Sequence, residues 1–252
     1  MISLKSTQWT IDNIETVILD KDGTFVDLHF FWGKLTELRA QAIINKYKLS
    51  QNLLPSLCLY LGYNLNRKRM EEDGITALYS RPKIINIFCS DLHKIGLKVS
   101  ENDIENIFNE VSNQFNCYIE RYIKPIPEAI DFIKQLKKSN IKLGVVTSDS
   151  VEATNLTLQY LNLDKTFSSI IGRESCKYKK ESGKPTEIAL KELNANPKTT
   201  VMIGDAPMDY LAAKNAGINH TILVASGQIC KENLHKTSNY VLNSLCELSI
   251  IQ

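Results

Sequence analysis

Residues 17–24 constrain the fold of this chain more than any other stretch, because an apolar run ends there in two aspartates. The run 17–19 is typical of a buried strand in a parallel sheet, and Asp20 and Asp22 follow it before Gly23 turns the chain. Side chains alternate along a strand, so we expect both carboxylates on one face. Two acids this close repel each other, and they favour a hard cation such as Mg²⁺ or a shared proton.

After about residue 125, short apolar runs alternate with segments that have helical apolar spacing. The runs predicted as strands are 142–146, 167–171, 200–203 and 221–224, with a last apolar tail at 240–242. The segments predicted as helices are 127–137, 151–161, 184–193 and 208–215. This alternation predicts right-handed crossovers, and therefore an α/β fold with a Rossmann-like parallel sheet covered by helices on both faces.

Residues 27–121 have a different character. Their apolar residues recur at helical spacing between breaks such as Pro55, Gly74 and Pro82, which predicts four or five helices and no strand. We therefore expect two domains: an α/β core formed by residues 1–26 and 122–252, and an all-helical domain of residues 27–121 inserted into it. Residues 1–15 are interpreted as a short lead-in to the first strand of the core.

Polar side chains follow the ends of three predicted strands. They are Asp20 and Asp22 after the first, Thr147 and Ser148 after 142–146, and Asp205 and Asp209 after 200–203. The carboxyl ends of parallel strands meet at one edge of a sheet, where α/β proteins bind ligands. Each group also has an ordinary interpretation, as a helix cap or a turn, and Lys184 before Pro185 by itself is typical of surface. Their joint occurrence in one α/β repeat favours a single site.

These residues stand in an order that resembles a known family. The sequence Asp20-x-Asp22-Gly23-Thr24 is followed by Val145-Val146-Thr147-Ser148, Lys184-Pro185 and Gly204-Asp205-x-x-x-Asp209. This order is similar to the four motifs of the phosphatase branch of the haloacid dehalogenase (HAD) superfamily. The inserted domain resembles the helical cap of the phosphoglycolate phosphatase and β-phosphoglucomutase subgroup, although it is longer than the usual four-helix cap.

The resemblance implies a role for each acidic residue. Asp20 is expected to attack phosphorus and form an aspartyl-phosphate, and Asp22 to protonate the leaving alcohol and then activate water. Mg²⁺ is expected to be held by Asp20, the backbone carbonyl of Asp22 and Asp205, with Asp209 supporting it through water. The second aspartate, Asp22, argues against a halide substrate, because dehalogenase members of the superfamily lack it.

The resemblance also implies the groups that bind the phosphoryl oxygens. Lys184 is expected to neutralise the nucleophile and these oxygens, while the Thr147 hydroxyl and the Ser148 backbone N–H donate hydrogen bonds to them. Lys21 replaces the aromatic or aliphatic residue more common between the two aspartates. We expect its side chain to point away from the metal without affecting the assignment.

The cap is expected to close over the site and select the leaving group. Its candidates for contacting a second polar group of the substrate are Arg67, Arg69, Arg81 and His29, although a surface role is the more common one for such residues.

Composition excludes several other classes. The formal net charge is +2, without the concentrated basic face that nucleic-acid binding requires. No apolar run approaches the length of a membrane span, and the six cysteines are scattered without metal-ligand spacing. We therefore expect a cytoplasmic monomer or homodimer with reduced, mostly buried thiols, and neither a nucleic acid nor a membrane as partner.

The predicted function is Mg²⁺-dependent hydrolysis of a small phosphate monoester, such as a sugar phosphate or phosphoglycolate. One alternative is a phosphomutase of the β-phosphoglucomutase type, which uses the same first step and returns the phosphoryl group to a sugar. Another is a non-catalytic receiver-like or binding domain, which would turn over no ester. Receivers also carry an acidic Mg²⁺ site on a parallel sheet, but they lack the Asp20–Asp22 spacing and a large helical insert.

Overall fold

The computed structural model describes the backbone of all 252 residues and every side chain except those of Ala77 and Leu78. The chain divides into two compact units. One comprises Met1–Asp27 with Ile123–Gln252, and the other comprises Leu28–Tyr122. The domain boundaries expected from the sequence, 26/27 and 121/122, lie one residue from these divisions.

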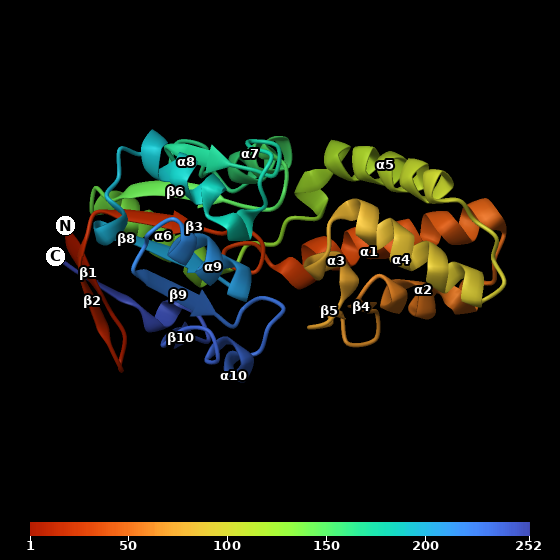
Figure 1. Ribbon diagram of the computed structural model, residues 1–252, viewed down its shortest axis with the longest axis horizontal. Helices are drawn as coiled ribbons and strands as arrows, with labels where there is room; N and C mark the ends of the chain where they lie inside the picture. The colour runs from red at the N-terminus through yellow and green to blue at the C-terminus, as the bar shows by residue number, and fades with distance from the viewer. The chain divides into compact units, whose positions relative to one another are not determined.

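A parallel sheet forms the centre of the first unit (Figure 1). Its strands are β3 (Thr16–Leu19), β6 (Lys142–Val146), β7 (Ser169–Ile171), β8 (Thr200–Gly204), β9 (His220–Val224) and β10 (Tyr240–Leu242). They lie in the order β10-β9-β8-β3-β6-β7, and all the neighbouring pairs are parallel. The predicted α/β fold is therefore confirmed. Because β3 lies between β6 and β8, the ends of these three strands meet at one edge.

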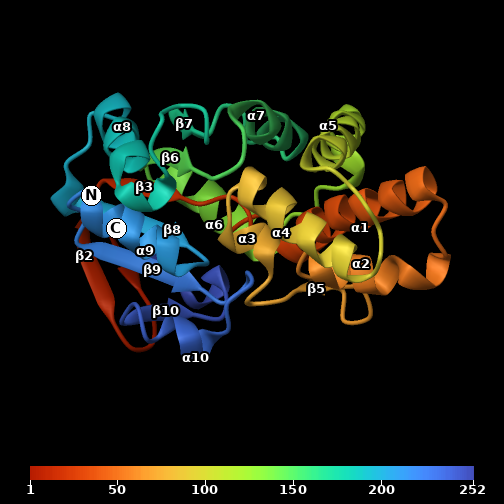
Figure 2. The same cartoon turned by 45° about the vertical axis from the view of Figure 1, so that its right-hand side comes forward.

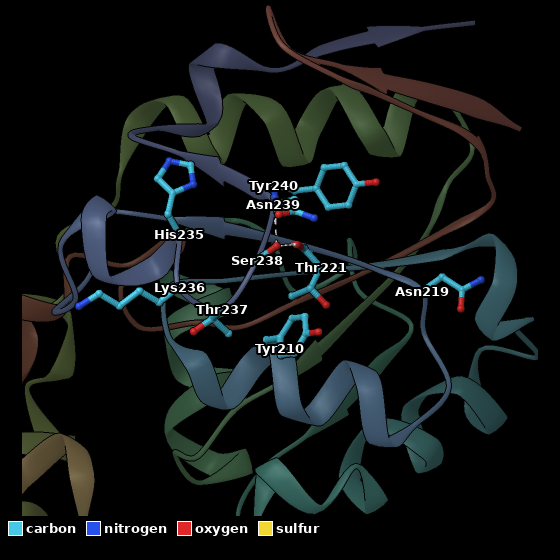
Figure 3. A pocket seen from close by; sticks show the side chains of 9 residues that line it. All are labelled: Tyr210, Asn219, Thr221, His235, Lys236, Thr237, Ser238, Asn239 and Tyr240. Carbon is cyan, nitrogen blue, oxygen red and sulfur yellow. Dashed lines mark hydrogen bonds between the residues drawn. The ribbon is translucent and has the colours of Figure 1, made fainter.

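Helices cover both faces of this sheet. They are α6 (Pro127–Lys138), α7 (Val151–Tyr160), α8 (Lys184–Glu192), α9 (Pro207–Asn215) and the short α10 (Lys231–Leu234). The 3₁₀ turns are η3 (Lys180–Ser182), η4 (Pro197–Thr199) and η5 (Leu245–Glu247). Helices α8 and α9 pack their apolar residues, such as Ala189 and Ala213, against Ile18 and Met202 of the sheet. Helix α6 lies on the opposite face from α9 (Figure 3).

The ends of the chain form a second, antiparallel sheet that the sequence analysis did not predict. Its strands are β1 (Ile2–Lys5), β2 (Thr10–Ile14) and β11 (Ser249–Ile251), in the order β11-β1-β2. The two termini accordingly lie close together (Figures 1 and 2). Residues 1–15 are therefore a hairpin and not only a lead-in. Trp9 packs edge-on against Tyr240, with ring centroids 5.0 Å apart.

The second unit is mainly helical. Its helices are α1 (Leu28–Tyr47), α2 (Leu54–Tyr60), α3 (Ile75–Leu78), α4 (Arg81–Lys94) and α5 (Glu101–Cys117), with 3₁₀ turns η1 (Gln51–Leu53) and η2 (Ile119–Arg121). The expectation of no strand was wrong, because β4 (Tyr63–Asn64) and β5 (Arg69–Met70) form a short antiparallel hairpin. His29 Nδ1 accepts a hydrogen bond from the Met70 N–H (3.1 Å), which ties this hairpin to α1.

In the part of the chain that the structure describes, none of the helices is both long and apolar enough to cross a bilayer. All six cysteines are free thiols. Cys58 and Cys89 are buried and the other four are partly or fully exposed, so the expectation of mostly buried thiols was wrong.

Candidate active site

The residues directly after β3 and β6 continue the backbone hydrogen bonding of the sheet into the site. The Asp20 N–H donates to the Ile203 carbonyl (2.8 Å), and the Thr147 N–H donates to the Ile171 carbonyl (2.9 Å). Leu19 lies in register with Val145 and with Ile203. The residues that follow β3, β6 and β8 are therefore held level at the carboxyl edge. The predicted residues Asp20, Asp22, Thr147, Asp205 and Asp209 are all buried there.

Asp209 organises the turn between β8 and α9. Its Oδ2 accepts the N–H groups of Asp205 (3.1 Å) and Ala206 (3.0 Å), at the start of α9. Its Oδ1 lies 2.6 Å from the Lys180 Nζ. Both carboxylate oxygens of Asp209 are thus engaged with donors of the protein, and they fix the backbone that presents Asp205.

The cation of the site is Lys180, not the predicted Lys184. The Lys180 Nζ forms ion pairs with Asp20 Oδ1 and Asp209 Oδ1, and its side chain is buried. Burial lowers the pKa of Lys180, but the charges of Asp20 and Asp209 outweigh burial and raise the pKa above its usual value. Lys180 therefore stays protonated, and its positive charge lies beside the predicted nucleophile, Asp20.

Lys184 lies outside this cluster. It is the first residue of α8, its side chain is half exposed, and its Nζ contacts the Glu187 carboxylate at 2.8 and 3.0 Å. The prediction was wrong because Lys184 lies on the exposed side of the first turn of α8, whereas Pro185 and Thr186 of that turn are buried, and the preceding turn η3 carries Lys180 inward. In the sequence, Lys180 ends a basic stretch that is typical of surface, so no motif distinguishes it.

Lys21 is a second buried cation that the sequence analysis set aside. Its Nζ lies 2.7 Å from Asp22 Oδ1 and 3.0 Å from Asp149 Oδ2, and its side chain is 0% exposed. The expectation that Lys21 has no bearing on the site was therefore incomplete, because it contacts the predicted proton donor. Asp149 also escaped the sequence analysis, although it follows Thr147 by only two residues.

The carboxylates of the site raise one another's pKa. Burial, followed by the negative charges of Asp209 and Asp22, raises the pKa of Asp20 to about 7 against the opposing effect of Lys180. Burial and the charges of Asp20 and Asp209 raise the pKa of Asp205 well above its usual value. The negative charge of this cluster therefore exceeds what Lys180 neutralises.

A hard divalent cation fits this excess of oxygen donors. The Asp20 and Asp205 carboxylates and the Asp22 backbone carbonyl could hold Mg²⁺, which usually keeps several waters as its other ligands. Among the described residues, no three His, Cys, Asp or Glu side chains are grouped so that they could hold a metal ion by themselves. Gly23 leaves space for this arrangement, since a Cβ there would lie 2.3 Å from Asp205 Oδ2.

Two of the predicted phosphate-binding residues, Thr147 and Ser148, lie at the end of β6. Thr147 is buried, and its Oγ1 accepts a hydrogen bond from the Asp149 N–H (3.1 Å), so its own O–H is oriented to donate elsewhere. Ser148 is exposed, and its Oγ lies 3.9 Å from the Met208 Sδ. In the second unit, Arg67 and Arg69 are exposed and Arg81 is half-buried, so their proposed contacts with a substrate stay predictions.

A separate cavity of about 210 Å³ lies between α9 and the β9–β10 edge (Figure 3). Its lining includes Tyr210, Thr221, Ser238 and Tyr240, and the Ser238 hydroxyl donates to the Thr221 carbonyl (2.8 Å). None of the predicted site residues lines it. The carboxylate cluster, and not this cavity, is therefore the candidate site.

Similarity to known proteins covers most of the chain. Residues 14–217 match the family described as haloacid dehalogenase-like hydrolase. A provisional pyrophosphatase PpaX of Clostridium perfringens is 28% identical over 211 residues, 81% of each chain. The pyrophosphatase PpaX of Bacillus cereus (strain G9842) is 24% identical over 139 residues, which span 55% of this chain and 64% of that relative.

Two crystal structures are similar in fold. A predicted phosphoglycolate phosphatase of Haemophilus somnus aligns with a TM-score of 0.71 and 17% identity, over 94% of this chain and 97% of that one. A β-phosphoglucomutase of Clostridium difficile aligns with a TM-score of 0.60 and 23% identity, over 92% of each chain. At these identities the likeness concerns the fold alone.

Proposed function

This chain belongs to the haloacid dehalogenase-like hydrolase family, and we propose that it is a Mg²⁺-dependent phosphomonoesterase acting through an aspartyl-phosphate. The resemblance and the hydrolase assignment made from the motifs are confirmed by the family match. One observation carries the proposal further. The ammonium of Lys180 pairs with Asp20 at the edge of the sheet where Asp22, Thr147 and Asp205 are also buried.

In the proposed first step, an Asp20 oxygen forms a bond to phosphorus and the bond from phosphorus to the leaving oxygen breaks. Asp22 gives its proton to that oxygen. In the second step Asp22 takes a proton from water, which attacks the aspartyl-phosphate and releases inorganic phosphate. Lys180 offsets the negative charge that gathers on the nucleophile and the phosphoryl oxygens.

The other groups bind and orient. The Thr147 hydroxyl and the Ser148 N–H donate to phosphoryl oxygens, while Asp209 fixes Lys180 and the turn that presents Asp205. When bound, Mg²⁺ supplies positive charge to the same oxygens. Its ligands would be Asp20, Asp205 and the Asp22 carbonyl. Because both Asp209 oxygens already have protein partners, we propose that Asp209 acts as a positioning residue, with any contact to the metal made through water.

The proposed substrate is a small phosphorylated metabolite, such as a sugar phosphate or phosphoglycolate. The pyrophosphatase names of the similar proteins make inorganic pyrophosphate a necessary member of any substrate panel. A cytoplasmic location, and a monomer or homodimer, stay predictions.

The test is phosphate release from p-nitrophenyl phosphate, phosphoglycolate, hexose and pentose phosphates, nucleotides and pyrophosphate, with Mg²⁺ and with a chelator. We expect Mg²⁺-dependent release that Asp20→Asn lowers at least about a thousandfold, because the nucleophile is removed. Asp164→Asn, which changes an exposed carboxylate in the same way, is the matched control and should leave the rate unchanged.

Two results would contradict the proposal. Transfer of phosphate between positions of a sugar without net release would indicate the phosphomutase. No turnover of any panel member by a folded, Mg²⁺-binding protein would indicate the binding domain.

A further inference from the structure

Lys21 is the least exposed charged residue that the structure describes, and the steps proposed above give it no task. Its side chain is completely buried, between the nucleophile Asp20 and the proton donor Asp22 in the sequence. An ammonium group is costly to remove from water, and a chain that keeps one here must pair it closely. The two carboxylates that do so, Asp22 and Asp149, come from the ends of two different strands, β3 and β6.

The partner Asp149 is itself rigidly held. Its Oδ1 accepts the Ser150 N–H (2.8 Å), its N–H donates to Thr147 Oγ1 (3.1 Å), and its carbonyl accepts the Arg173 N–H (2.9 Å). Its Oδ2 then faces the Lys21 Nζ at 3.0 Å. The ammonium of Lys21 is therefore fixed by a group that is anchored independently of Asp22.

The second carboxylate of this arrangement is that of Asp22. The Lys21 Nζ donates to Asp22 Oδ1 at 2.7 Å, a short distance that is typical of a charge-assisted hydrogen bond. This contact restrains the rotation of the Asp22 carboxyl about its own bond.

We infer that Lys21, anchored on Asp149, is a positioning residue that holds Asp22 in the orientation from which it protonates the leaving oxygen. The inference rests on the proposed function, because it assigns a task within that reaction. It also gives a reason why Lys21 follows β3 while its partner Asp149 follows β6. The same ammonium that orients Asp22 ties the nucleophile loop to the phosphate-binding loop.

A purely structural ion pair would behave differently in one measurable respect. Breakage of the bond to p-nitrophenolate needs little help from an acid, because this leaving group is stable as an anion. Breakage of the bond to an alkoxide depends strongly on protonation, and a positioned general acid contributes about 10²- to 10⁴-fold. Misplacing Asp22 should therefore slow an alkyl ester much more than the nitrophenyl ester, whereas general loosening of the site slows both alike.

The experiment compares kcat/KM for glycerol 2-phosphate and p-nitrophenyl phosphate in Lys21→Met and Asp149→Asn, with Mg²⁺. The constant kcat/KM covers the steps through the first irreversible one, so the later attack of water does not obscure the comparison. We expect Lys21→Met to lower the value about a hundredfold or more for glycerol 2-phosphate and less than about tenfold for p-nitrophenyl phosphate. Asp149→Asn keeps the acceptor for the Ser150 N–H and should show the same selectivity in smaller measure.

Equal losses for both esters in variants with wild-type circular dichroism would overturn the positioning role and leave the proposed function intact. Unchanged constants for both esters would also overturn it. If Lys21→Met does not fold, the ratio for Asp149→Asn decides the question. Failure of the proposed function has a separate signature, because the wild-type protein would then release no phosphate from these two esters or from any member of the substrate panel, and the role of Lys21 would fall with it.

Discussion

Two lysines four positions apart in the chain have opposite surroundings. Lys180 is buried against Asp20 and Asp209, whereas Lys184 lies half exposed beside Glu187. Removing the first ammonium leaves two buried carboxylates facing each other and takes away the charge that stabilises a phosphoryl group. Removing the second disturbs only an exposed ion pair, which contributes little.

We therefore expect Lys180→Met to lower kcat/KM for phosphate esters by about 10²- to 10³-fold, and Lys184→Met to stay within about twofold of the wild type. The two variants make the same chemical change, so each is the control for the other. Circular dichroism checks that both fold. A large loss in Lys184→Met with little loss in Lys180→Met would reverse the assignment made from the structure.

The residues that sequence patterns could predict are those whose position relative to a strand end is fixed. Asp20, Thr147 and Asp205 each come within one residue of the end of β3, β6 or β8, so the strand pattern places them. Lys180 lies in an irregular segment between β7 and α8. In such a segment, no strand or helix periodicity predicts which side chains point toward the sheet. Its inward orientation depends on tertiary contacts with α9, which a local pattern does not contain.

At the scale of elements, the turn η3 is the piece that brings Lys180 to the site. The Asn215 side chain at the end of α9 donates to the Glu181 carbonyl (2.8 Å). Gly183 closes the turn at φ +81°, and a Cβ there would lie 2.7 Å from the backbone carbon of Asn215. The absence of a side chain at Gly183 thus lets η3 approach α9 closely enough for Lys180 to reach Asp209.

This close approach predicts that Gly183→Ala displaces η3 and with it Lys180. We expect kcat/KM to fall at least about tenfold and the free energy of unfolding to fall by about 2–4 kcal/mol, from the left-handed backbone and the steric overlap together. Gly96→Ala is the control, because Gly96 has a similar φ of +83° with nothing within 4 Å of its added Cβ. It should cost only about 1–2 kcal/mol and leave activity unchanged. Equal effects of the two substitutions would contradict the argument.

Elements with strong local signals were predicted, and those that depend on distant pairing were not. Helices α6, α8 and α9 show apolar spacing and begin at or next to a proline, which sequence patterns capture. Strands β1 and β11 are short, and they pair the two ends of the chain. A local sequence pattern does not predict which distant segment a short strand pairs with. The hairpin β4–β5 has two residues in each strand, too few to show a period of two.

At the scale of the whole molecule, each compact unit contains one of the two tryptophans. Trp9 packs against Tyr240 in the α/β unit (5.0 Å between ring centroids), and Trp32 packs against Phe31 in the helical unit (5.6 Å). A Trp32→Phe background therefore leaves a fluorescent reporter for the α/β unit alone. This separation matters because a chain with two compact units can unfold in more than one transition.

In that background, the pKa of Asp20 predicts how the stability of the α/β unit depends on pH without divalent metal. The pKa is about 7 in the folded protein, mainly because of burial, and 3.8 is its ordinary value. Between these values the folded state binds the extra proton, so this contribution to stability is fully present below about pH 4 and is lost as pH rises toward 7. Asp205, whose pKa is also raised, acts in the same direction.

Asp20→Asn removes the contribution of Asp20, so at pH 8 we expect the variant to be more stable than the wild type by a few kcal/mol, on the order of 1.4 kcal/mol per pKa unit at most. The difference should shrink toward pH 4, and Mg²⁺ should reduce it at pH 8 by stabilising the ionised wild-type site. The measurement is urea unfolding followed by Trp9 fluorescence from pH 4 to 8, with a chelator and then with Mg²⁺. The opposite result would be a wild-type protein that gains stability relative to Asp20→Asn as the pH rises in the chelator. It would show that Lys180 lowers the pKa of Asp20 by more than burial raises it, and that the carboxylates of the site are neutralised without a metal.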